Sequence, residues 1–160
     1  MIFVTVGKGI DPFDRLVKAA DGLAAEMDEK VFIQYGSSSY KPVHAEGRDY
    51  LTFPEAQELT RASSIMIAHA GIGTIIGALR SGIPIVIVPR YKKNREHFND
   101  HQLEIAEAVK GRPGVEVVYE GDDLRSAVAR LLEIKRPLVP QVSGAGLIDA
   151  IDDFLSGLNG

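Results

Sequence analysis

Residues 69–74, His-Ala-Gly-Ile-Gly-Thr, have the types and spacing needed to hold a phosphorylated ligand. An apolar run at residues 65–68 precedes them, and a pattern typical of a helix follows at residues 75–80. A strand that turns through two glycines straight into a helix leaves backbone N–H groups unpaired at the positive end of the helix dipole. Such a turn favours phosphate or diphosphate. The alternative is that Gly71 and Gly73 only close the turn.

Two common phosphate-binding motifs do not account for this turn. The dinucleotide fingerprint Gly-x-Gly-x-x-Gly follows a first strand, and the P-loop ends in Gly-Lys-Ser or Gly-Lys-Thr. Neither spacing occurs at residues 69–74. Gly71 and Gly73 do allow close approach to the backbone, and Thr74 adds a hydroxyl, so these residues suit a diphosphate.

A second polar segment, residues 89–102, holds two of the four histidines and four basic residues. It follows an apolar run at residues 83–88, which places it at the same edge of a parallel sheet as the glycine turn. Asp100, His101 and Gln102 are poor choices for the first turn of a helix unless they cap it or face a ligand. Aspartate and glutamine together offer the donors and acceptors that sugar hydroxyls require. The alternative is a solvated loop that leads into a helix.

Four side chains in loops that follow expected strands are candidates for contacts to a phosphate or a carboxylate: Lys8, Ser37, Ser38 and Arg90. Tight turns and a solvated basic face are the alternatives for these positions. The basic residues of the 89–102 segment also raise the hypothesis of a sugar ligand that carries a carboxylate, that is, a uronic acid.

The composition excludes several classes of protein. The chain has 160 residues, enough for one domain with a substantial core, and its net charge of −4 argues against a broad nucleic-acid surface. It has no cysteine, which excludes disulfides and thiolate metal sites. His97 and His101 would share one helix face if both were helical, but nothing else indicates a metal, so none is expected. No apolar run approaches the roughly 20 residues that span a bilayer, and residues 1–6 lack the features of a signal peptide.

Strand-like and helix-like segments alternate along the chain. Strands are expected at residues 2–6, 31–35, 50–53, 65–68, 83–88 and 115–119, and helices at residues 12–25, 54–62, 75–80, 98–109 and 124–134. Asp11 and Pro12 have the types expected at the N-cap and the first position of a helix. The alternation predicts an α/β fold, a Rossmann-like parallel sheet with helices on both faces. Its ligand is expected beyond the carboxyl ends of the strands.

The chain divides into two parts on this interpretation. Residues 1–135 form the Rossmann-like domain, and residues 136–160 form an extended, proline-containing crossing followed by an amphipathic helix near residues 146–155. The apolar face of that helix packs either on its own sheet or on a partner, and both alternatives remain open.

Four ordered motifs are shared with a known family: His69-Ala70-Gly71-x-Gly73-Thr74, Ala78-Leu79-x-x-Gly82-x-Pro84, Val88-Pro89-Arg90 and Glu96-His97-x-x-Asp100-His101-Gln102. They resemble the C-terminal domain of family 28 glycosyltransferases. The resemblance covers residues 1–135, and is greatest to small bacterial exopolysaccharide and capsule transferase subunits. Those are similar to the soluble catalytic subunit of the eukaryotic two-part UDP-N-acetylglucosamine transferase.

The resemblance implies the donor-binding half of a GT-B enzyme, which transfers a sugar from a UDP-linked donor with inversion and without a cofactor or metal. By resemblance the diphosphate maps onto His69, Gly71, Gly73 and Thr74, the donor sugar onto Asp100, His101 and Gln102, and the base cleft onto Thr52 and Phe53. A membrane-associated partner subunit would supply the acceptor contacts and the catalytic base, and the acceptor would be a lipid-linked sugar. The chain itself would be cytoplasmic, recruited to the inner face of the cell membrane by that partner.

Two positions depart from the family pattern. Gly77 stands where many relatives carry an acidic residue that holds the ribose, and Lys8 stands where the subunits show a small hydroxyl residue. The leading hypothesis is a donor-binding catalytic subunit of a two-component inverting glycosyltransferase in exopolysaccharide or capsule synthesis. The alternative is a non-catalytic scaffolding subunit that stabilises a membrane-associated partner, which the change at Gly77 favours.

Overall fold

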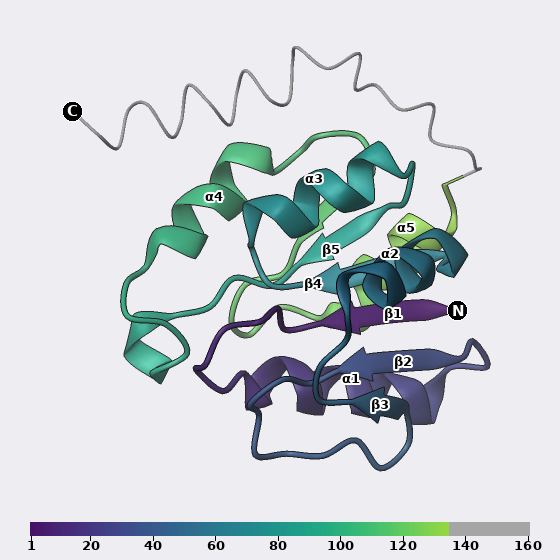
Figure 1. Ribbon diagram of the computed structural model, residues 1–160. Coiled ribbons are helices and arrows are strands. Elements are labelled where there is room, and N and C mark those ends of the chain that lie inside the picture. Colours follow the sequence, from purple (N-terminus) through teal and green to yellow (C-terminus); the bar gives the residue numbers. More distant parts are fainter. Residues whose placement is uncertain (135–160) are drawn as a thin grey trace.

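The computed structural model describes residues 1–134, so the extended crossing and the helix expected within residues 136–160 lie outside the described residues. Helices and strands alternate along the described chain (Figure 1). In order they are β1 (Ile2–Thr5), α1 (Asp14–Glu26), β2 (Val31–Gln34), β3 (Glu46–Arg48), α2 (Phe53–Ala62), β4 (Ile65–Ala68), α3 (Ile72–Arg80), β5 (Ile85–Ile87), the 3-10 helix η1 (Lys92–Asn94), α4 (His101–Val109), β6 (Val115–Val117) and α5 (Leu124–Leu132).

The strands form one sheet in the order β3-β2-β1-β4-β5-β6, and every neighbouring pair is parallel. Val4 of β1, for example, lies between Ile33 of β2 and Ile67 of β4. The carboxyl ends of all strands therefore meet at one edge, and the strand order switches direction between β1 and β4. This sheet, with helices on both faces, confirms the expected α/β fold (Figure 1).

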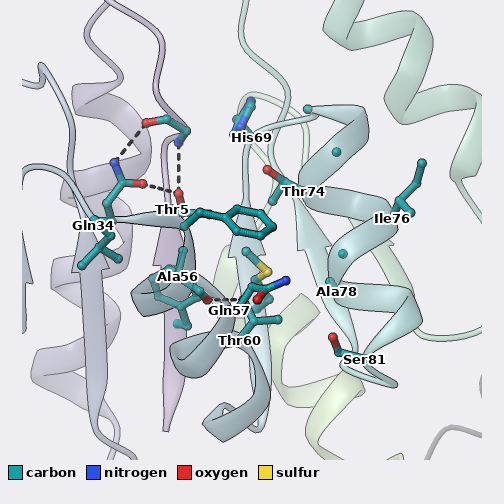
Figure 2. Close-up of a pocket in the computed structure, with 18 of the residues that line it drawn as sticks. Thr5, Gln34, Ala56, Gln57, Thr60, His69, Thr74, Ile76, Ala78 and Ser81 are labelled. Atoms are coloured by element: carbon teal, nitrogen blue, oxygen red, sulfur yellow. Dashed lines mark hydrogen bonds between the residues drawn. The ribbon is translucent and has the colours of Figure 1, made fainter.

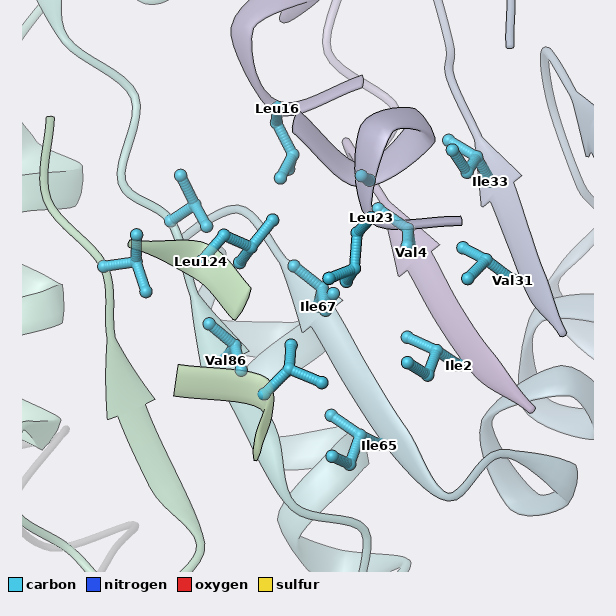
Figure 3. Packing of buried hydrophobic residues seen from close by; sticks show 14 of the residues in the cluster. Ile2, Val4, Leu16, Leu23, Val31, Ile33, Ile65, Ile67, Val86 and Leu124 are labelled. Carbon is cyan, nitrogen blue, oxygen red and sulfur yellow. The ribbon is translucent and has the colours of Figure 1, made fainter. Parts of the chain in front are cut away.

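The helices cover the two faces of the sheet in two groups, each with its own hydrophobic core. α1 and α5 cover one face, where Leu23 and Leu124 belong to the same buried cluster as Ile67 (Figure 3). α3 and α4 cover the other face with a second cluster that includes Phe3 and Ile75. The central strand β4 is buried along its whole length, which explains its unbroken apolar sequence.

Helix α1 begins after Phe13, so the expectation that Asp11 caps it was wrong. The carbonyls of Asp11 and Pro12 accept hydrogen bonds from Nη1 of Arg90, at 2.9 and 3.4 Å. The N–H of Phe13 donates to the hydroxyl of Ser38, at 3.0 Å. These contacts to distant parts of the chain hold the segment before Phe13 in a loop.

The third strand is β3, and the expectation of a strand at residues 50–53 was wrong. Thr52 instead caps α2: its hydroxyl accepts from the N–H of Glu55 at 3.4 Å, and the Glu55 carboxylate accepts from the N–H of Thr52 at 2.7 Å. This capping box satisfies N–H groups that a helix start leaves unpaired. β3 is exposed along its length, so no apolar alternation marks it in the sequence. α4 likewise begins at His101 rather than at residue 98.

Asp21 of α1 is a buried carboxylate that orders the segment before β3. Burial by itself would raise its pKa, but hydrogen bonds from the Tyr40 hydroxyl and from the N–H groups of Val43, Ala45 and His44 outweigh burial. They lower the pKa of Asp21 from 3.8 to about 2. The charged form of Asp21 therefore stabilises the fold.

Acid is expected to remove this contribution. A carboxyl group whose pKa is lower in the folded chain than in the unfolded chain stabilises the fold above its unfolded pKa, 3.8 here, and loses that contribution as the pH falls to about 2. We expect Asp21→Asn to lower the free energy of unfolding by about 2 kcal/mol at neutral pH and to flatten its fall between about pH 5 and pH 2. Chemical denaturation across this range measures both effects, with the exposed Asp28→Asn as control. An unchanged pH profile in Asp21→Asn would contradict the assignment.

Candidate functional site

An open groove with a volume of about 1070 Å³ lies between α2 and α3 and reaches the carboxyl edge of the sheet (Figure 2). Phe3 of β1 and Met66 of β4 line it from the side of the sheet. The groove thus lies at the switch in strand order, where open α/β sheets bind their ligands. Of the residues expected from the sequence, those that line it are Lys8, Phe53, His69, Gly71, Gly73 and Thr74.

The first turn of α3, which we call the anion seat, has features in this groove that would suit an anion. Gly71 is its N-cap, no side chain caps the helix, and its first turn has no acidic residue. The first N–H groups of a helix have no partner within it and carry the positive end of its dipole. A side chain at Gly73 would meet no other part of the described chain within 4 Å, so a ligand can approach the backbone there.

His69 lies beside this turn, held between two glycines. A side chain on Gly7 would come within 2.4 Å of Nε2 of His69, and a side chain on Gly71 would come within 2.2 Å of its Cε1. Gly7 also has a φ of +80°, a conformation that glycine adopts without strain. The imidazole therefore fills the side-chain space of both glycines and joins the loop after β1 to the loop after β4.

The protein environment keeps His69 neutral at physiological pH. Its enclosure, and after that the charges of Arg90 and His97, lower the pKa of His69 from 6.5 to about 4. A neutral imidazole has one N–H donor and one acceptor nitrogen. His69 can therefore donate a single hydrogen bond to a ligand oxygen at the edge of the groove.

Gln102 of α4 is buried behind His69 and is not among the residues that line the groove. Its Oε1 accepts hydrogen bonds from the N–H groups of Ala70 and Arg90, both at 3.1 Å. Its Nε2 lies 3.4 Å from Nδ1 of His69. Gln102 therefore joins the loops that follow β4 and β5.

Arg90 is 2% exposed and holds the loops at this edge together. Nη1 donates to the carbonyl of Glu96 and Nη2 to the carbonyl of Val6, both at 2.8 Å, in addition to its bonds to the loop before α1. Its guanidinium also lies 4.6 Å from the centre of the Phe13 ring. The geometry gives Arg90 a structural role and does not support a direct contact with a phosphate or a carboxylate.

Comparison with known proteins adds to this geometry. Residues 1–144 match the sequence profile of the glycosyltransferase family 28 C-terminal domain. The chain belongs to this family. It is similar to the UDP-N-acetylglucosamine transferase subunit ALG13 of Cryptococcus neoformans var. neoformans, with 32% identity over 102 residues that cover 61% of this chain and 48% of that protein. The subunit of the same name from Yarrowia lipolytica is 33% identical over 122 residues, which cover 67% of this chain and 59% of that protein. The chain thus spans about half the length of these curated relatives.

Solved structures share the fold of this family 28 domain. The NMR structure of ALG13 superimposes with a TM-score of 0.58 at 19% identity, covering 94% of this chain and 93% of that one. The calicheamicin glycosyltransferase CalG4 superimposes with a TM-score of 0.63 at 19% identity, covering 99% of this chain and 43% of that one. These likenesses confirm the expected α/β fold.

In the family 28 domain, Asp100 and His101 lie near the edge of the sheet but do not line the groove. The Asp100 carboxylate accepts from the N–H of Lys92 at 2.8 Å. The His101 ring lies 3.3 Å from the Glu104 carboxylate. Their expected contact with the donor sugar stays a prediction. Lys92, Lys93 and Arg95 do not line the groove either, so the uronic acid hypothesis gains no support from them.

The other expected residues differ in their positions. Ser38 is buried and supports the start of α1, and Ser37 is exposed; neither lines the groove. Thr52 caps α2, while Phe53 is 66% exposed and lines the groove. Lys8 also lines it. A contact of Lys8 with phosphate and of Phe53 with a base remain predictions.

Sequence reasoning missed Thr5 and Gln34, which line the groove from β1 and β2 (Figure 2). The Thr5 hydroxyl donates to Oε1 of Gln34 and accepts from the N–H of Gly7 at 3.1 Å. Nε2 of Gln34 donates to the carbonyl of Gly7, also at 3.1 Å. The sequence could have indicated Gln34, because it is a polar residue at the end of an otherwise apolar strand. Gln57 of α2, which also lines the groove, gave no such signal because it resembles any exposed helix residue.

The groove offers a ligand backbone N–H groups, hydroxyls, a neutral imidazole and the ammonium of Lys8. Among residues 1–134, no group of three or more histidine, aspartate or glutamate side chains is placed to hold a metal ion. In this same part of the chain, no helix has the length and apolar content needed to cross a bilayer.

Proposed function

We propose that this chain binds the UDP-sugar donor of a two-part, inverting glycosyltransferase. The observation that supports this most strongly is the first turn of α3, which opens uncapped and without acidic residues into the groove beside neutral His69. A diphosphate there would accept hydrogen bonds from backbone N–H groups and from the Thr74 hydroxyl. Phe53, which also lines the groove, offers an aromatic face to the uracil ring.

The chemistry of sugar transfer agrees with this placement. An acceptor hydroxyl attacks the anomeric carbon, the bond from that carbon to the UDP oxygen breaks, and the hydroxyl proton passes to a general base. Negative charge develops on the departing UDP, and N–H groups fixed at a helix start stabilise it without a metal. We assign the general base to the partner subunit.

We also propose a membrane-associated partner that supplies the acceptor site. A GT-B active site lies between two domains, and residues 1–134 build one of them. The curated relatives are named as subunits. The proposed acceptor is a lipid-linked sugar in exopolysaccharide or capsule synthesis, so the partner would recruit this chain from the cytoplasm to the inner face of the cell membrane. Little transfer is then expected from this chain alone.

Calorimetric titration with UDP, UDP-N-acetylglucosamine, UDP-glucose and UDP-glucuronate tests donor binding. UDP-N-acetylglucosamine is the first donor to test because the curated relatives are named for it. We expect saturable binding that falls roughly tenfold or more in Gly73→Asp, because a carboxylate would occupy the anion seat. Gly73→Asn is the matched control, because its side chain has a similar size but no charge. Its affinity for the donor should fall less than that of Gly73→Asp. Equal affinities for the chain and Gly73→Asp would contradict the proposal.

A second candidate function is non-catalytic scaffolding of the partner. Gly77 favours it, because this position of the groove has no acidic side chain to hold the ribose hydroxyls, and the space beside it is open to 4 Å. A folded chain that stabilises the partner but binds no UDP-sugar, alone or in the complex, would select this function.

A further inference from the structure

We propose that Gln102 is a positioning residue that holds His69 in one neutral tautomer, with the proton on Nε2 and facing the groove. The tautomer is a property of the protein alone, whereas its use as a hydrogen-bond donor to a diphosphate rests on the proposed function. Gln102 then acts through His69, in contrast to the sugar contact that the family resemblance implies.

Two backbone donors determine the orientation of the Gln102 amide. The N–H groups of Ala70 and Arg90 both point at the same atom of Gln102, each at 3.1 Å. Only the carbonyl oxygen of an amide accepts hydrogen bonds. A flipped amide would place an NH₂ group against two other donors, so Oε1 must occupy this position.

The orientation of the amide in turn determines the tautomer of His69. With Oε1 turned toward the two backbone donors, Nε2 of Gln102 faces Nδ1 of His69 at 3.4 Å. An amide nitrogen donates and does not accept, so Nδ1 must present its lone pair. The single proton of the neutral imidazole is then on Nε2.

Nε2 of His69 is accessible from the groove. His69 lines the groove, and Nε2 occupies the side-chain space of Gly7. In the described part of the chain, no buried side-chain nitrogen or oxygen lacks a hydrogen-bond partner. Within residues 1–134, the hydrogen bond of the His69 ring is at Nδ1, and none joins Nε2 to another residue. Nε2 is therefore free to donate to a ligand.

Burial, and after it the charges of Arg90 and His97 on the loop that follows β5, lower the pKa of His69 and favour its neutral form. The neutral imidazole of His69 can turn toward a phosphate oxygen either a protonated nitrogen, which donates a hydrogen bond, or an unprotonated nitrogen, which has a lone pair. The lone pair would repel the oxygen, so the choice that Gln102 imposes decides whether His69 assists or opposes binding.

Nitrogen NMR of the full chain labelled with ¹⁵N-histidine tests the tautomer directly. Long-range proton–nitrogen spectra distinguish a protonated ring nitrogen from a bare one. We expect a bare Nδ1 and a protonated Nε2 for His69 across about pH 6–8, with the exposed His44 as an internal reference. A proton on Nδ1, or an averaged signal from both tautomers, would overturn the proposal.

Gln102→Glu replaces the amide group that donates a hydrogen bond to Nδ1 of His69 with a carboxylate, which can only accept one. Glutamate still offers an acceptor to the N–H groups of Ala70 and Arg90, but it places a carboxylate oxygen against Nδ1 of His69. We expect a proton on Nδ1 and a pKa of His69 raised by roughly 1–3. Gln57→Glu adds the same charge to the groove from α2 and should leave the proton on Nε2. If His69 in a folded Gln102→Glu chain keeps its proton on Nε2 and its pKa is unchanged, the proposal is also overturned.

Addition of UDP to the labelled chain separates the two proposals. A shift of the Nε2 signal on binding supports both of them. The expected tautomer without any UDP binding would contradict the proposed function and leave the role of Gln102 intact. UDP binding by a chain with its proton on Nδ1 would overturn the role of Gln102 alone.

Discussion

Gly71→Ala is expected to abolish detectable UDP binding and to destabilise the fold. The added Cβ would lie 2.2 Å from Cε1 of His69, closer than atoms can approach. Either the imidazole leaves its position between Gly7 and Gly71, which removes the proposed His69 donor, or the start of α3 moves, which displaces the anion seat. Forcing an extra methyl group into a packed site costs about 1–3 kcal/mol. Thermal unfolding and calorimetric titration with UDP measure the two effects.

Gly73→Ala is the matched control, two positions further into the same turn. Its Cβ would meet no other part of the described chain within 4 Å, so the protein has room for it. We expect the free energy of unfolding to be unchanged or raised by roughly 0.5–1 kcal/mol, since alanine is the better helix former. UDP affinity should still fall, because the methyl group would stand where we propose that the diphosphate approaches. If both variants unfold alike, His69 is not held as described.

Arg90→Ala is expected to be the most destabilising single change near the groove. It removes the donors that satisfy the carbonyls of Val6, Asp11 and Glu96, at 2.8–2.9 Å, and opens a gap beside Phe13. Buried carbonyls left without partners cost about 1–3 kcal/mol each. We expect a total loss of about 3–5 kcal/mol in the free energy of unfolding, measured by chemical denaturation.

Two further variants test the cause of this loss. Arg90→Lys keeps the charge, but an ammonium cannot reproduce the planar fork that reaches carbonyls in separate loops, so most of the loss should remain. Lys92→Ala removes an exposed basic side chain from the same loop and should change stability by less than about 0.5 kcal/mol. A loss in Arg90→Ala no larger than in Lys92→Ala would show that the buried guanidinium is not what holds the loops together.

Local patterns in the sequence were enough to predict the fold, and they predicted a site at the edge of the sheet where the structure has a groove. The aliphatic run Ile65–Ala68 matches β4, because a central strand covered on both faces must be apolar throughout. Alternation of such runs with helical patterns predicted the parallel sheet. The turn at Gly71 and Gly73 predicted an uncapped helix start at the carboxyl edge, where the structure places the groove.

Strand β3 shows where local patterns were insufficient. It is an exposed edge strand of polar residues, formed by pairing with β2 rather than by burial. The capping box of Thr52 and Glu55 also starts α2 at Phe53, within the segment expected as a strand. Periodicity detects which face of an element is buried, and β3 has no buried face.

The sequence by itself determined the central strands, most of the helices and the glycine turn, because each depends on residues close together in the chain. Only the tertiary structure decided which polar side chains face the groove and which support it. Gln102 and Arg90 have the types expected of ligand contacts, yet both are buried and bind the backbone of distant loops. Arg90 reaches Val6 across 84 residues of sequence. The partner of a polar side chain depends on what the fold brings beside it, and neither residue type nor spacing contains that information.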